Sequence, residues 1–89
     1  MRPDPTGSVT NVSHSRLEFF VEPFVSGQPG PHVRAAIAAV ERCGLPVEFG
    51  AFGNVAEGTL EQIADACAAL VRDAVAAGAT RISVQVVSG

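Results

Sequence analysis

Two stretches near opposite ends of the folded part alternate between apolar and polar side chains. The first is Leu-Glu-Phe-Phe-Val-Glu-Pro-Phe at residues 17–24, and the second is Thr-Arg-Ile-Ser-Val-Gln-Val-Val at residues 80–87. In the second, Ile82, Val84 and Val86 alternate strictly with polar residues. A period of two is typical of a β-strand with one buried face, so the pattern predicts a strand at each place.

Two segments between these strands repeat their apolar residues at helical spacing instead. Residues 31–43 begin with Pro31, which suits the first turn of a helix, and are followed by Gly44, which suits its end. The second segment begins at Thr59, where Gln62 three residues later completes a capping box, and it runs to Gly78. The pattern therefore predicts two helices.

The segment between the two helices favours a β-hairpin. Residues 47–52 and 54–57 read as two short strands, joined at Gly53-Asn54. The predicted order is βαββαβ, an α+β class. This order predicts a ferredoxin-like sandwich, whose four-stranded antiparallel sheet has the strand order 4-1-3-2 and carries both helices on one face.

The chain has room for one small domain, since it contains 89 residues. Residues 1–15 mix Pro, Gly, Ser, Thr and Asn without periodicity, which is typical of a flexible tail. We therefore expect a tail at residues 1–15 and a single domain at residues 16–89.

Composition narrows the possible partners. The net charge is −3, and no run of Lys or Arg offers a basic face, so nucleic acid is not an expected partner. No segment has the roughly 18 consecutive apolar residues of a membrane helix, and the amino terminus lacks the apolar centre of a signal peptide. We expect a cytoplasmic protein that binds neutral or cationic molecules.

The cysteines and histidines predict no special chemistry. Cys43 and Cys67 are too few for a disulfide framework, and both fall on helix positions that predict core packing. No Cys or His has metal-ligand spacing, so no metal site is expected. A phosphatase of this fold needs an Arg in the glycine-containing loop after the first strand, and residues 26–31 contain none. We expect no catalytic residues and a protein that is not an enzyme.

The open face of the predicted sheet carries an unusual mixture of side chains. Strand alternation places Phe20, Glu22 and Phe52 there, away from the helices. Exposed aromatic rings indicate a binding surface. Two interpretations remain open: packing of the sheets of two copies, and a flat cationic ligand held at the rim by carboxylates and rings.

Three stretches of the sequence resemble one family. These are Val-Glu-Pro-Phe-Val-Ser-Gly at residues 21–27, Gly-Leu-Pro-Val-Glu-Phe-Gly-Ala-Phe-Gly-Asn-Val-Ala-Glu-Gly at residues 44–58, and Ala-Gly-Ala-Thr-Arg-Ile-Ser-Val-Gln-Val at residues 77–86. Together they resemble the thiamine-binding protein family related to YkoF, over residues 17–87. The family usually has Gly-Thr-x-x-Glu-Gly at residues 53–58, and here Asn54 replaces the threonine.

The resemblance implies a non-catalytic protein that binds thiamine (vitamin B1) or its hydroxymethylpyrimidine half, with no other cofactor. It also implies a homodimer or homotetramer assembled through the open sheet faces. The predicted ligand-binding residues are Phe20, Glu22, Phe52, Asn54 and Glu57. Each has an alternative role: interface packing for the two rings, a strand-end carboxylate in water for Glu22, a turn residue for Asn54, and helix-dipole complementation for Glu57. A structural or regulatory oligomerisation module without a ligand remains the alternative function.

Overall fold

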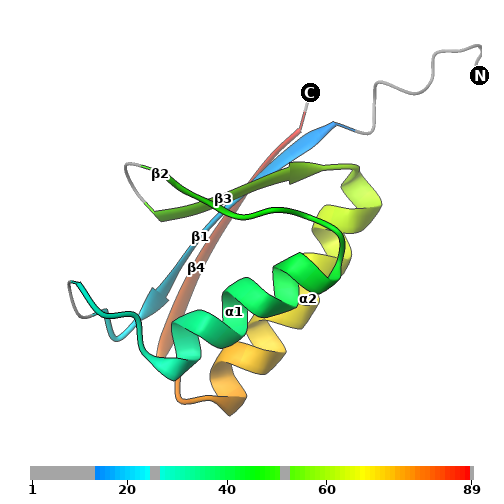
Figure 1. Cartoon of the computed structure of the whole chain (residues 1–89). Helices are drawn as coiled ribbons and strands as arrows, with labels where there is room; N and C mark the ends of the chain where they lie inside the picture. The colour runs from blue at the N-terminus through cyan, green and yellow to red at the C-terminus, as the bar shows by residue number, and fades with distance from the viewer. Residues whose placement is uncertain (1–13, 25–26, 51–52, 89) are drawn as a thin grey trace, which may run out of the picture.

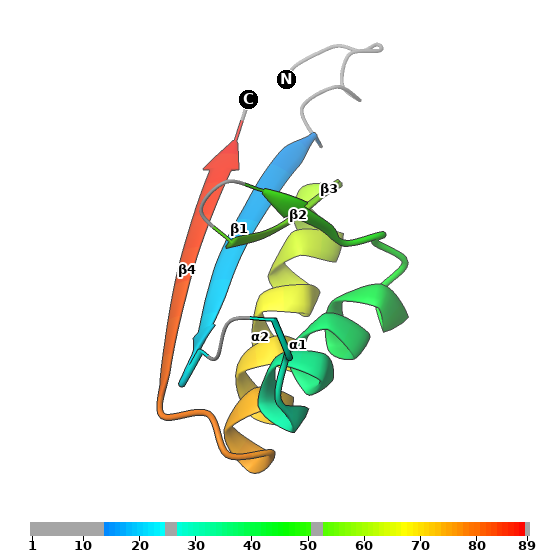
Figure 2. The same ribbon diagram turned by 60° about the vertical axis from the view of Figure 1, so that its left-hand side comes forward.

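The computed structural model describes residues 14–24, 27–50 and 53–88. The elements follow one another as β1 (Ser15–Glu22), α1 (Pro31–Arg42), β2 (Glu48–Gly50), β3 (Gly53–Gly58), α2 (Leu60–Ala76) and β4 (Arg81–Ser88). Figures 1 and 2 show both helices side by side on one face of the sheet. The predicted βαββαβ ferredoxin-like sandwich is confirmed.

The sheet has the strand order β2-β3-β1-β4, and all three strand pairs are antiparallel. This is the predicted order 4-1-3-2. β1 is central, and Phe19 lies opposite Asn54 on one side and Val84 on the other. β2 has only three residues, whereas the pattern predicted a strand at residues 47–52. Residues 51–52 lie outside the described part of the chain.

The two helix starts follow the predicted chemistry. α1 begins after Gly30, with Pro31 in its first turn. At the start of α2, the Gln62 backbone N–H donates to Thr59 Oγ1, and the Thr59 N–H donates to Gln62 Oε1, both at 3.0 Å. This capping box satisfies two of the N–H groups that a helix start leaves without partners. No helix in the described residues combines the length and hydropathy needed to cross a membrane.

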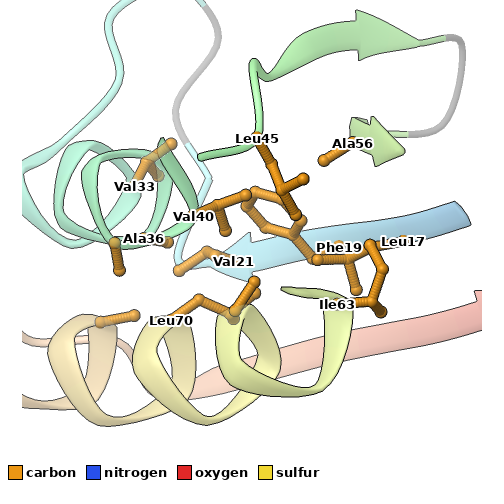
Figure 3. Packing of buried hydrophobic residues seen from close by; sticks show 13 residues of the cluster. Leu17, Phe19, Val21, Val33, Ala36, Val40, Leu45, Ala56, Ile63 and Leu70 are labelled. Carbon is orange, nitrogen blue, oxygen red and sulfur yellow. The ribbon is translucent and has the colours of Figure 1, made fainter. Parts of the chain in front are cut away.

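The core lies between β1 and the two helices (Figure 3). Leu17, Phe19 and Val21 point from β1 toward the helices and are at most 2% exposed. Leu70 of α2 is fully buried beneath them. Burying each such side chain contributes about 1.5–3 kcal/mol, so this layer supplies much of the favourable free energy of folding. Cys43 and Cys67 are half-buried against it, as predicted for core packing.

Three apolar residues that strand alternation places on the helix-covered face are exposed. Phe49 is 80% exposed, and Val84 and Val86 are 40% and 43% exposed. They lie on the expected face of the sheet, because the register places them on the same face as Phe19. β2 and β4 are the edge strands, however, and the helices pack mainly over the centre of the sheet. The alternation of residues along a strand therefore determines which face of the sheet a side chain lies on. The position of that strand in the sheet determines how far the side chain is buried.

β1 begins one residue before the predicted start of the folded domain at residue 16. Residues 1–13 lie outside the described part of the chain, and His14 is the first described residue. Ser15, which the sequence placed in the tail, already belongs to β1 and is 1% exposed. The folded domain therefore includes Ser15, because pairing with both β3 and β4 extends β1 to that residue.

Candidate functional site

A cavity of about 560 Å³ lies where β1 ends and the chain turns toward α1. Its walls come from the end of β1, the connection to α1, the first turn of α1 and the paired ends of β2 and β3. The side chains that line the cavity include Phe20, Phe24, Gln28, Val33, Phe49 and Asn54. The volume lies within the range of small-molecule binding sites.

Three phenylalanines give the cavity an aromatic wall. The Phe20 and Phe24 rings are in contact, with centroids 5.4 Å apart and planes inclined by 41°. Phe24 is 59% exposed and Phe49 is 80% exposed, so both rings have large free surfaces. Soluble proteins rarely leave neighbouring aromatic rings this open unless the surface binds something. Such rings can stack against a flat heteroaromatic ligand.

Asn54 supplies the buried polar group of the cavity wall. It is only 5% exposed, and its Nδ2 donates a long hydrogen bond of 3.4 Å to the carbonyl oxygen of Phe19. Its Oδ1 is buried without a hydrogen-bond partner among the described residues. An unsatisfied buried acceptor costs about 1–3 kcal/mol, so a donor at this place would stabilise the protein.

Hydrogen bonds to backbone carbonyls hold the β1–α1 connection that carries Phe24 and Gln28. The His32 Nε2 lies 2.5 Å from the Pro23 oxygen, and the Arg34 guanidinium donates to the Pro29 oxygen at 2.6 Å. The backbone N–H of Thr80 donates to the Glu22 oxygen at 2.8 Å. These bonds anchor both ends of the connection, which positions its side chains beside the sheet.

Glu22 lies beside the cavity without lining it. It shares the open face with Phe20, because alternate residues of a strand point the same way. Its carboxylate Oε1 is 3.5 Å from Nε of Arg81, the residue opposite it on β4. Both side chains are substantially exposed, so this ion pair contributes about 0–1 kcal/mol and a competing cation can displace it.

Glu57 lies away from the cavity. The register places it opposite Arg16, whereas Asn54 is opposite Phe19, three residues and about 10 Å further along the sheet. Its carboxylate is 3.6 Å from His14 Nε2, and it lines a separate depression together with Glu48. The structure thus brings Phe20 and Asn54 together at the cavity and leaves Glu57 outside. Phe52 lies outside the described residues.

Most of the cavity wall was not predicted from the sequence. Gln28, Val33 and Phe49 were not among the predicted site residues, although all three line the cavity. The available signal was the Ser-Gly-Gln-Pro-Gly-Pro stretch at residues 26–31, which marks a long connection leaving a strand end. Connections of this kind often carry binding residues.

The cavity wall is uncharged. Among its described lining residues, Gln28 and Asn54 are the polar side chains and none is ionisable. Within the described residues, no three His, Cys, Asp or Glu side chains gather closely enough to hold a metal ion. Burial raises the pKa of the Cys67 thiol, which lies on α2 away from the cavity. The wall is therefore suited to binding a neutral ring through stacking and hydrogen bonds.

Two solved structures share this fold. One is a domain of unknown function from Bacillus cereus, with a TM-score of 0.62, 24% identity and coverage of 86% of this chain and 75% of that chain. The other is a hypothetical protein from Methanocaldococcus jannascii, with a TM-score of 0.63, 22% identity and coverage of 86% and 79%. At these identities the likeness supports the fold alone. No curated protein matches the chain at a significant level.

The sequence profile described as "Thiamine-binding protein" matches residues 17–87. The match spans all six elements apart from the ends of β1 and β4, and it includes every described residue of the cavity wall. The chain belongs to the thiamine-binding protein family.

Proposed function

We propose that this protein binds thiamine or its hydroxymethylpyrimidine half, without catalysing a reaction. The observation that carries the proposal is the cavity of about 560 Å³, with its aromatic and amide walls, in a chain of the thiamine-binding protein family. The cavity is large enough for one aromatic ring with its substituents. Its described walls hold no acid, base or nucleophile, which favours binding over catalysis.

The two halves of thiamine suit two different parts of this region. The neutral aminopyrimidine fits the uncharged cavity, where Phe20 and Phe49 can stack and Asn54 can accept a hydrogen bond. The cationic thiazolium would extend toward the open face, where Glu22 supplies a carboxylate in place of its pairing with Arg81. Phe52 stays a proposed contact, and Glu57 is not proposed to touch a ligand held in this cavity.

We also propose that copies of the chain associate through the open sheet face. Phe20 of β1 is half-buried there, and Val87 of β4 is 52% exposed on the same face. Apolar side chains in this position favour packing against a second sheet. A module that only self-associates, with no small ligand, is the alternative that these same residues favour.

Native mass spectrometry of the purified protein, with and without thiamine or hydroxymethylpyrimidine, separates the two functions. The proposal predicts an oligomer whose mass rises by one ligand per protomer. An oligomer whose mass stays unchanged at saturating concentrations of both compounds would contradict ligand binding and support the self-association module.

A further inference from the structure

The hydrogen bond to Phe19 determines which end of the Asn54 amide group faces β1. The carbonyl oxygen of Phe19 can only accept a hydrogen bond, so the NH₂ end of Asn54 must face it, at 3.4 Å. The free end is therefore the acceptor Oδ1, which is buried and lacks a partner among the described residues. Asn54 Oδ1 is closed to solvent as the side chain stands, but Asn54 lines the cavity, so a rotation of its amide would turn this acceptor toward a donor on a bound ligand.

From this we infer that Asn54 determines ligand specificity: it selects flat rings that present an N–H donor, such as an aminopyrimidine, over rings that present a carbonyl oxygen at that position. This inference rests on the proposed function, because it concerns the same cavity. It assigns to Asn54 the role of a specificity residue, in place of the turn role that its position in a hairpin suggests.

The local geometry lets Asn54 reach a ligand. Asn54 and the preceding Gly53 both line the cavity. The bond to Phe19 lies near the long limit for a hydrogen bond, so a small rotation of the amide toward the cavity gives up little. In that rotation the NH₂ end keeps its side toward Phe19 and Oδ1 turns toward the ligand.

The other amide of the wall cannot supply the same selection. Gln28 is exposed on the β1–α1 connection, so either end of its amide can turn to the ligand and the other end can be satisfied by water. It therefore accommodates a donor and an acceptor equally. The remaining described wall side chains are apolar. Discrimination between an amino and an oxo group thus depends on Asn54.

The test uses two rings that differ at one substituent and at the ring nitrogen beside it. Hydroxymethylpyrimidine carries an exocyclic amino group. Its oxo counterpart carries a carbonyl oxygen instead, and the adjacent ring nitrogen becomes an N–H donor, while the other substituents are identical. Calorimetric titration of each compound into the wild-type protein should show a preference for the amino compound of about tenfold or more. The carbonyl oxygen of the oxo compound would face Asn54 Oδ1, and neither oxygen can donate a hydrogen bond.

Three variants locate the source of that preference. Asn54→Leu removes the acceptor at similar volume, and Asn54→Thr offers a hydroxyl that can donate or accept. In both, the ratio of the two affinities should fall toward one. Gln28→Leu is the matched control, since it removes the other amide of the wall, and there the ratio should be kept. Thermal melts establish that each variant is folded. If Asn54→Leu does not fold, the result for Asn54→Thr is used in its place.

The outcomes separate the inference from the proposed function. Equal binding of both rings to the wild type would overturn the inference and leave the proposed function standing. A preference that survives Asn54→Leu or Asn54→Thr, or that disappears in Gln28→Leu, would also overturn it. If the wild type binds neither ring nor thiamine, the proposed function fails and the inference fails with it.

Discussion

Gly53 and Phe19 approach each other so closely that a Cβ on residue 53 would lie 2.9 Å from the Phe19 carbonyl oxygen. Gly53 also has a φ of +144°, a conformation that side chains with a Cβ rarely adopt. This approach brings β3 against β1 beside the cavity and positions Asn54 in its wall.

Gly53→Ala should therefore lower the free energy of unfolding. The backbone strain alone costs about 1–3 kcal/mol, and the contact with the Phe19 backbone adds to that cost. Gly27→Ala is the matched control, because Gly27 also has a positive φ of +84° but a Cβ there would meet no described residue within 4 Å. Denaturant melts of both variants check this. If both variants lose the same free energy of unfolding, the close contact with Phe19 does not contribute to the effect of Gly53→Ala.

Leu70→Ala should lower the free energy of unfolding by about 2–5 kcal/mol, since the fully buried side chain leaves a cavity between α2 and β1. Val75→Ala on the same helix is the control. Val75 is 56% exposed, so its loss should change stability by about 0.5 kcal/mol or less. A loss below about 1 kcal/mol for Leu70→Ala in denaturant melts would contradict the assigned packing of α2.

Phe20→Asp should shift the ligand-free protein toward monomer, because it places a charge in the proposed contact between open sheet faces. Val75→Asp introduces the same charge on the helical side and should leave association unchanged. Sedimentation velocity at micromolar concentration measures both. A wild-type protein that is already monomeric under these conditions would rule out the proposed assembly.

Glu22→Gln should weaken thiamine binding by about tenfold and hydroxymethylpyrimidine binding by much less. The substitution removes the carboxylate charge at nearly constant size, and only thiamine carries the thiazolium cation that such a charge would pair with. Arg81→Gln provides the opposite change, since it frees Glu22 from its ion pair and should strengthen thiamine binding. Titrations in which Glu22→Gln weakens both ligands equally would place Glu22 at the pyrimidine end instead.

The sequence predicted the fold well because its signals were local. The capping box at Thr59 and Gln62 and the alternation of β1 are set by neighbouring residues, and both appear in the structure. The exposure of Phe49 could not be predicted in this way. It depends on how far the helices extend across the sheet, which no local pattern encodes.

The candidate site was predictable only in part, because it is assembled from distant segments. Phe20 was predicted through strand alternation and Asn54 through its place in the family motif, and both line the cavity. The pairing of Glu22 with Arg81 depends on the register between β1 and β4. The wall residues Gln28 and Val33 depend on the path of the β1–α1 connection, which the sequence leaves undefined.

Binding of a thiamine-class ring in the cavity beside Phe49 is the central proposal. Phe49→Ala tests it most directly, since Phe49 lines the cavity but is 80% exposed, so the variant should fold normally. Calorimetric titration of hydroxymethylpyrimidine into the wild type, Phe49→Ala and Val75→Ala compares a wall residue with an exposed residue elsewhere. We predict saturable binding to the wild type and Val75→Ala, and about tenfold weaker binding to Phe49→Ala because the stacking surface is lost. Equal affinities for all three proteins would contradict the claim.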